Sequence, residues 1–139
     1  MLTEADRRRV AEELGALPSP VRLVFFTQTF GCDTCDDTKR LLEEVVSLSP
    51  QLTLVEHNLV LDKEAAERYG VDRAPAVVLE GEQDTGIRFY GAPIGYEFVS
   101  LLTAIKLVSA RDSGLTAESR ALVAGVHEPV NIQVFSTPG

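Results

Sequence analysis

The two cysteines of this sequence lie three positions apart, in the run Cys32-Asp33-Thr34-Cys35. The run follows a continuous apolar stretch rich in β-forming residues, 21–27, and precedes a pattern with helical spacing. At the start of a helix, unpaired backbone N–H groups and the helix dipole stabilise a thiolate, which lowers the pKa of a cysteine below its usual ~8.5. We therefore predict that Cys32 is the nucleophile in disulfide exchange. Cys35, one helical turn later, is expected to resolve the mixed disulfide.

Other uses of a close cysteine pair stay open on the residues alone. A tetrahedral zinc site needs four ligands, and the two histidines, His57 and His127, lie far apart in the sequence. A zinc ion shared between two chains and a pair of inert buried cysteines are therefore the remaining alternatives. His57 itself is expected to be a strand-end or surface residue rather than a catalytic base. For disulfide exchange the sequence predicts no metal and no organic cofactor, only the redox-active pair.

Three acidic residues crowd the expected start of the helix, which we place from Asp33 onward: Asp33, Asp36 and Asp37. Carboxylates are favourable there to the helix dipole, but they repel a neighbouring thiolate. Together with Thr34 they are expected to modulate Cys32 and to make it less acidic than in a strongly oxidising C-x-x-C protein. A weaker stabilisation of the thiolate would favour the role of a reductant. The alternative is that the aspartates are only helix-start residues.

Length and composition indicate one ordinary globular domain without a basic face. The chain has 139 residues, 45% of them hydrophobic and 24% charged, with a formal net charge of −8. That charge argues against nucleic acid or an anionic membrane surface as a partner. No run approaches the ~20 apolar residues of a membrane span, and no signal peptide is recognisable. We expect a cytoplasmic protein, since a reducing compartment suits a catalytic cysteine pair.

The elements expected around the motif alternate between helix and strand. Helices are predicted over 3–14, 33–48, 63–69, 94–108 and 116–124, and strands over 21–27, 52–59, 75–80, 85–90 and 130–136. The order predicts an α/β fold whose central mixed sheet, βαβ and then ββα, is flanked by helices. This fold would have an extra N-terminal helix and, at the C-terminal end, a linker helix and a strand.

The last of these strands repeats the character of the first. Residues 130–136 (VNIQVFS) match residues 21–27 (VRLVFFT) in their Val, aliphatic and Phe positions. We expect residues 1–110 to form one unit, 111–129 a linker with a short helix, and 130–139 the first strand of a truncated second unit. A chance likeness between two buried strands is the alternative.

This element order resembles the thioredoxin superfamily, with C-x-x-C after the first strand and Pro75 opening the third. The resemblance implies a cis Ala74–Pro75 peptide bond that faces the cysteines, with the backbone of Ala74 pairing with a bound peptide. Residues 89–98 (FYGAPIGYEF), the segment from 114 and residues 131–138 are similar to the N-terminal unit of two-unit, glutaredoxin-like protein disulfide oxidoreductases. The fold expected from the resemblance is therefore the thioredoxin fold.

The resemblance also implies a function and partners. It implies a thiol-disulfide oxidoreductase of the thioredoxin/glutaredoxin-like type that reduces or exchanges disulfides of other proteins. A flavoprotein thioredoxin reductase is the expected reductant, and an electron relay serving a peroxiredoxin is the alternative within the same chemistry. A redox-inert docking module is the alternative of another class. Thioredoxins carry a buried aspartate late in the first strand, where this chain has Phe26.

Overall fold

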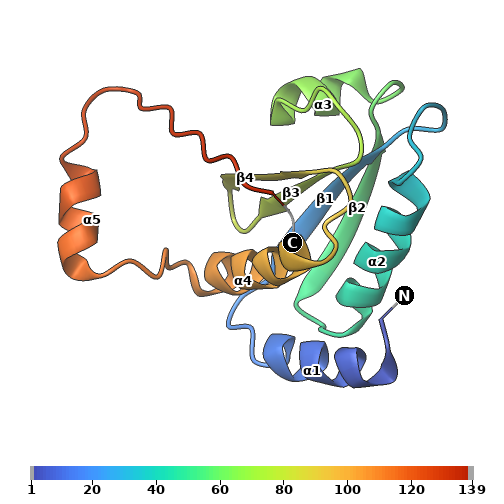
Figure 1. Cartoon of the computed structure of the whole chain (residues 1–139), viewed down its shortest axis with the longest axis horizontal. Helices are drawn as coiled ribbons and strands as arrows, with labels where there is room; N and C mark the ends of the chain where they lie inside the picture. The colour runs from blue at the N-terminus through green and yellow to red at the C-terminus, as the bar shows by residue number, and fades with distance from the viewer. Residues whose placement is uncertain (1, 138–139) are drawn as a thin grey trace.

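The computed structural model describes residues 2–137, and its centre is a four-stranded mixed sheet with helices on both faces (Figure 1). The helices are α1 (Glu4–Leu14), α2 (Cys35–Ser47), α3 (Lys63–Tyr69), α4 (Tyr96–Ala110) and α5 (Ala117–Ala124). The strands are β1 (Val21–Thr27), β2 (Leu52–Asn58), β3 (Ala76–Glu80) and β4 (Asp84–Tyr90), and their order across the sheet is β2-β1-β3-β4. The predicted α/β class and the mixed sheet are confirmed.

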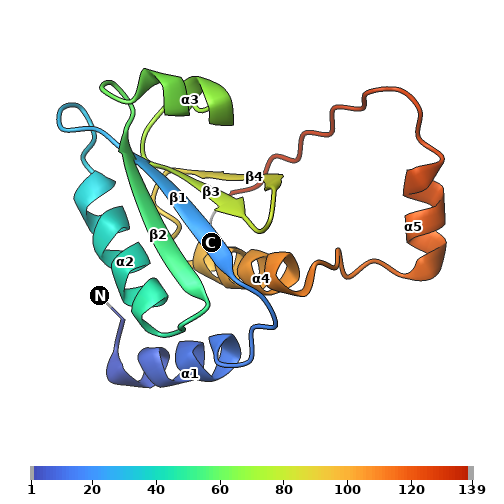
Figure 2. The ribbon, with the colours of Figure 1, turned by 180° about the vertical axis from the view of Figure 1, so that it is seen from behind.

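The pairing of the strands brings four loops to one end of the sheet. β1 runs parallel to β2, with Thr27 opposite Asn58, and antiparallel to β3, with Phe26 opposite Ala76. β4 runs antiparallel to β3, so Tyr90 also lies at this end. We call it the cysteine end, and it comprises the loops 28–34, 59–62, 72–75 and 91–95. Figure 2 shows the sheet and its helices from behind.

The two faces of the sheet carry separate apolar clusters, and β1 contributes to both. Leu23 and Phe25 pack in the larger cluster, under α1, α2 and α4, whereas Val24 and Phe26 pack in the smaller one, under α3. All four side chains are fully buried. A strand covered on both faces reads as a continuous apolar run, which explains the VRLVFFT sequence.

Some elements begin later than the sequence predicted. α2 begins at Cys35 rather than at Asp33, because residues 33–34 form a turn in which the Cys35 amide contacts the Cys32 carbonyl at 3.5 Å. Cys32 therefore lies two residues before the N-cap residue Thr34. β3 begins at Ala76, since Pro75 has no N–H to donate to the ladder. α4 begins at Tyr96 rather than at residue 94, because Gly95 has a φ of +60°.

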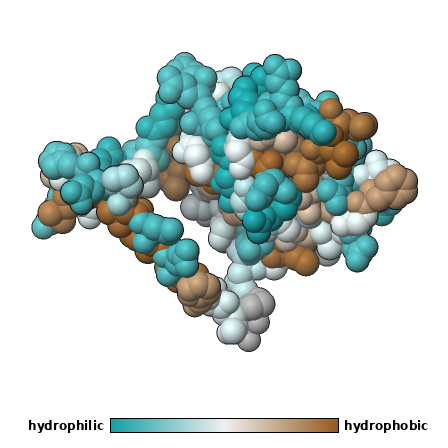
Figure 3. Space-filling model, turned by 90° about the horizontal axis from the view of Figure 1, so that it is seen from above, coloured by the Kyte–Doolittle hydropathy of each residue, from teal (hydrophilic) through white to brown (hydrophobic). Residues whose placement is uncertain are grey.

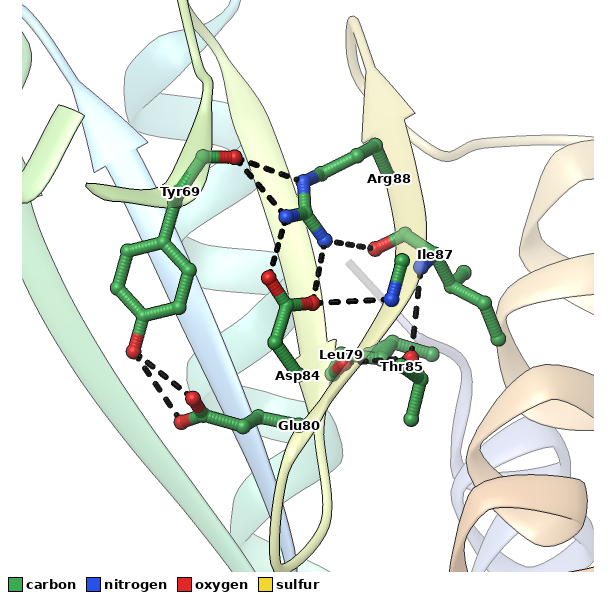
Figure 4. A network of polar contacts seen from close by, with 8 residues as sticks. Tyr69, Leu79, Glu80, Asp84, Thr85, Ile87 and Arg88 are labelled. Carbon is green, nitrogen blue, oxygen red and sulfur yellow. Dashed lines mark hydrogen bonds and ion pairs between the residues drawn. The ribbon is translucent and has the colours of Figure 1, made fainter. Parts of the chain in front are cut away.

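The hairpin at the opposite end of the sheet is tied to α3 by a polar network (Figure 4). Arg88 donates to both carboxylate oxygens of Asp84, at 2.8 and 2.6 Å, and to the backbone carbonyl of Tyr69. The Tyr69 hydroxyl in turn donates to Glu80 at 3.0 Å. The hydrogen bond from Arg88 lowers the pKa of Asp84, and burial raises the pKa of Tyr69. Both groups therefore hold the charge state that the network needs at neutral pH.

The chain after α4 leaves the body of the molecule, as Figures 1 and 2 show from opposite sides. α5 has no buried residue, and residues 126–137 are exposed throughout. The strand predicted over 130–136 is not formed, because a strand needs a neighbouring strand for its hydrogen bonds and none lies beside this segment. Residues 138–139, the end of the predicted third part, lie outside the described residues. The division into 1–110, 111–129 and 130–139 stays a prediction.

Across residues 2–137, no helix combines the length and the apolar character that crossing a membrane requires.

Candidate functional site

Cys32 and Cys35 are joined by a disulfide, with their Cα atoms 5.5 Å apart. The two cysteines differ in exposure. Cys35, the first residue of α2, is 2% exposed, whereas Cys32 is half-buried in the preceding loop. The sulfur that a second protein can reach is therefore that of Cys32. This asymmetry suits the predicted roles of an attacking and a resolving cysteine.

The loop before Cys32 is held in place by its own polar side chain. The Gln28 side-chain amide donates to the carbonyl of Phe30 at 2.8 Å and to that of Gly31 at 3.3 Å. Gly31 has a φ of +72°, a conformation that side chains with a Cβ rarely adopt. These features fix the path of the chain from the end of β1 into the C-x-x-C turn.

The start of α2 is anchored by Thr38 rather than by the aspartates. The Thr38 amide and hydroxyl both donate to the Thr34 carbonyl, at 3.0 and 2.7 Å, and Thr38 is fully buried. Asp33, Asp36 and Asp37 are all exposed. None of the three makes a hydrogen bond or an ion pair with another residue of the described chain. Their expected effect on Cys32 stays a prediction.

The Ala74–Pro75 peptide bond is cis, and Pro75 is buried at the cysteine end. The carbonyl of Pro75 accepts a hydrogen bond from the amide of Gly91 at 2.9 Å, which fastens this turn to the end of β4. Arg73 pairs with Asp72 at 2.9 Å, and its guanidinium lies 5.5 Å from the centre of the Tyr90 ring. The strand pairing thus brings the proline turn to the same end of the sheet as the C-x-x-C loop.

The interior near the end of β1 is apolar. Phe26 is fully buried, and its ring lies 5.4 Å from that of His57 and 6.0 Å from that of Tyr69. His57 is a half-buried residue near the end of β2, with Nδ1 3.8 Å from Asp62. The position where thioredoxins carry a buried acid is therefore filled by an aromatic cluster.

Sequence reasoning missed an ion pair close to Cys35 along α2. Lys39 lies one helical turn after Cys35, and its Nζ is 2.7 Å from a carboxylate oxygen of Glu56 on β2. The hydrogen bond to Glu56 raises the pKa of Lys39, and Asp36 adds to this more weakly. The spacing of Cys35 and Lys39 is visible in the sequence, but the pairing with Glu56 depends on how α2 packs on the sheet.

Within residues 2–137, no group of three or more His, Cys, Asp or Glu side chains is placed to hold a metal ion. The only close sulfur pair of this region is the disulfide itself.

Comparison with known proteins gives relatives of two kinds. The chain is 31% identical over 113 residues, 81% of its length, to the alkyl hydroperoxide reductase protein AhpF of Staphylococcus epidermidis. It is 28% identical, with a TM-score of 0.80 over 90% of its length, to a protein disulfide oxidoreductase of Aeropyrum pernix. The structure of AhpF from Enterococcus faecalis, a C503A mutant, matches with 25% identity and a TM-score of 0.81 over 91% of the chain. No protein-family model matches.

The matched proteins are longer than this chain. The alignment spans 20% of the S. epidermidis protein, and the structural matches cover 55% of the A. pernix chain and 61% of the E. faecalis chain. The similarity therefore concerns the thioredoxin-fold region of these proteins. The thioredoxin fold expected from the sequence is confirmed by these structures.

Proposed function

We propose that this chain, a thioredoxin-fold homologue of the N-terminal domain of AhpF and of protein disulfide oxidoreductases, exchanges disulfides with other proteins through Cys32 and Cys35. The observation that carries the proposal is the disulfide at the head of α2, with one half-buried and one buried cysteine. A redox-active disulfide acts without an added cofactor, as in the homologues. The finer assignment is to the thioredoxin/glutaredoxin-like type.

The exchange proceeds in two steps. In the reduced chain, the Cys32 thiolate attacks one sulfur of a substrate disulfide, and the other substrate sulfur leaves and takes up a proton. The Cys35 thiol then gives up its proton and attacks the sulfur of Cys32. This attack releases the second substrate sulfur, which also becomes a thiol. Two electrons pass to the substrate, and the Cys32–Cys35 disulfide seen in the structure is the oxidised product.

The Ala74–Pro75 turn is proposed to hold the substrate chain during the exchange. The turn lies at the cysteine end, and the hydrogen bond between Pro75 and Gly91 fastens it to the sheet. An extended peptide that pairs with the backbone of Ala74 would be aligned by main-chain hydrogen bonds, in the manner of an added strand. Asp33, Thr34, Asp36 and Asp37 are proposed to adjust the reactivity of Cys32.

The partners proposed are disulfide-containing proteins, a flavoprotein thioredoxin reductase as electron source and, in the relay version, a peroxiredoxin. The similarity to AhpF supports the relay version. A reducing compartment such as the cytoplasm would keep the pair ready to donate electrons. Specific transfer to one peroxiredoxin, with poor reduction of insulin, would favour the relay over a general reductant.

The reduction potential of the pair is the direct test. The chain is equilibrated in glutathione or dithiothreitol buffers, and the fraction of disulfide is measured at each ratio. A reversible couple near the thioredoxin value of about −270 mV is expected for a reductant, whereas a value near −120 mV would indicate a disulfide-forming enzyme.

A cysteine variant tests the order of attack. Cys35→Ser is expected to accumulate a mixed disulfide between Cys32 and a substrate protein, because the resolving thiol is missing. Cys32→Ser is the matched control and should trap nothing. A chain without a reversible couple, or one in which the control traps as well as Cys35→Ser, would leave the redox-inert docking module as the better explanation.

A further inference from the structure

Two neighbouring loops of the cysteine end hold large apolar side chains in solvent. Phe30, two residues before Cys32, is 87% exposed, and Leu61, in the loop between β2 and α3, is 80% exposed. Val60 beside it is 59% exposed. Single exposed apolar residues are ordinary on a protein surface, but a group beside a reactive cysteine suits a contact surface.

The two loops start side by side. β1 and β2 are parallel and end together, with Thr27 opposite Asn58. The first residue after β2, Leu59, donates its amide hydrogen to the Thr27 carbonyl at 2.8 Å. The segments that carry Phe30 and Leu61 therefore leave the sheet from adjacent strand ends. Figure 3 looks at the molecule from above, and apolar surface gathers on the side away from α5, where these loops lie.

Both loops are fixed by hydrogen bonds of their own. Gln28 bonds the carbonyl of Phe30, as described for the site. The Asn58 side-chain oxygen accepts the amide hydrogens of Val60 and Leu61, both at 3.0 Å, and Asp62 accepts that of Asn58 at 2.7 Å. The apolar side chains are thus presented on ordered backbone. A surface that is already ordered loses less entropy when a partner covers it.

Negative charge surrounds these apolar side chains. The carboxylates at this end belong to Asp33, Asp36, Asp37, Asp62 and Asp72, against the two cations Lys63 and Arg73. Arg73 is already paired with Asp72. The local excess of negative charge matches the net charge of −8 of the whole chain. Such a rim attracts a positively charged partner and repels an acidic one.

We propose that Phe30, Val60 and Leu61 form a docking surface for the disulfide partner, a polypeptide with an apolar side chain and Lys or Arg residues next to its cysteine. The proposal rests on the function proposed above. It differs from the contact at Ala74–Pro75, which would bind the main chain of any extended peptide. The docking surface would select among sequences.

The test uses disulfide-bridged synthetic peptides and the reduced full chain. One peptide carries Leu and two Lys residues beside its disulfide, a second has Ser in place of Leu, and a third has Glu in place of Lys. The measured quantity is the rate constant for each peptide divided by that for the small disulfide 5,5′-dithiobis(2-nitrobenzoate). This ratio removes changes in the reactivity of Cys32 itself. The Leu/Lys peptide is expected to exceed each of the others about tenfold, which equals about 1.4 kcal/mol.

Matched variants locate the preference. Leu61→Ser and Phe30→Ser are expected to remove most of the advantage of the Leu/Lys peptide. Leu122→Ser and Phe135→Ser, on the chain after α4, are controls of the same residue types, since Leu122 is 72% and Phe135 89% exposed. They should keep the advantage in full. Equal ratios for all peptides, or equal losses in both pairs of variants, would overturn the docking surface. Failure to reduce even the small disulfide would instead contradict the proposed redox function.

Discussion

Replacing Ser109 with alanine should destabilise the fold through a single contact between distant segments. Ser109, in the last turn of α4, is 1% exposed. Its hydroxyl donates to the carbonyl of Ser19 at 2.6 Å and accepts the Ser19 amide hydrogen at 3.1 Å. The Ser19 hydroxyl also donates to the carbonyl of Ser109, a bond that the alanine variant keeps. The substitution therefore leaves two backbone groups of Ser19 without their partner.

The expected cost follows from these two hydrogen bonds. Each is worth about 1 kcal/mol net, and an unpaired buried group costs about 1–3 kcal/mol. Ser19 is only half-buried, so water can replace part of what is lost. We expect a loss of about 2 kcal/mol in the free energy of unfolding. For a chain of this size that corresponds to a fall in Tm of roughly 5–8 °C.

Urea unfolding followed by far-UV circular dichroism measures the change in the free energy of unfolding. Ser100→Ala is the control, because Ser100 lies in the same helix, is exposed, and bonds only the Tyr96 carbonyl at 3.4 Å. It gains helix propensity from alanine without losing a buried partner, so it should be neutral or slightly stabilising. Equal stability of the two variants would refute the assignment of the energy to the contact between Ser109 and Ser19.

Two further substitutions test local features of the fold. Gly70→Ala should cost about 1 kcal/mol, because Gly70 ends α3 at a φ of +65° and nothing crowds its Cβ position; Gly70→Asn should cost less in the same urea titration. Asp84→Asn should cost about 1 kcal/mol at pH 7, a figure reduced for the solvent that reaches this pair. Arg88 lowers the folded-state pKa of Asp84, so its stabilisation is present above pH ~4 and is lost as the pH falls through that lowered pKa. Urea titrations at pH 7, 5 and 3 should show the difference from wild type shrinking at acid pH, and a constant difference would contradict the pairing.

The sequence predicted the elements well where a periodic pattern or a continuous apolar run decides the structure. β1, with its fully buried side chains, and α2, with its apolar stripe, belong to this class. The predicted boundaries were wrong where single residues decide them, as with Gly95 before α4 and the turn at Cys32. The strand predicted over 130–136 was wrong for another reason. A strand pattern states which residues could pair, whereas pairing depends on the presence of a partner strand.

The candidate site was only partly readable from the sequence. The C-x-x-C run and Pro75 are local signals, so residue types and spacing were enough to find them. Phe30 and Leu61 gave no such signal, because exposure at adjacent strand ends depends on the register of β1 and β2. The pairing of Lys39 with Glu56 likewise follows from the way α2 lies on the sheet. Such contacts come from tertiary packing and have no sequence spacing of their own.

The position of β1 has a consequence for how the molecule opens. β1 is bonded to a strand on each side and supplies side chains to both apolar clusters, so its amides can exchange with solvent only when most of the fold opens. The loop that follows Thr27 has no such neighbours. The transition from the most protected segment to a readily exchanging one therefore falls between Thr27 and Cys32. A reactive disulfide attached this closely to the last segment to unfold can open, close and bind partners while the rest of the chain keeps its structure.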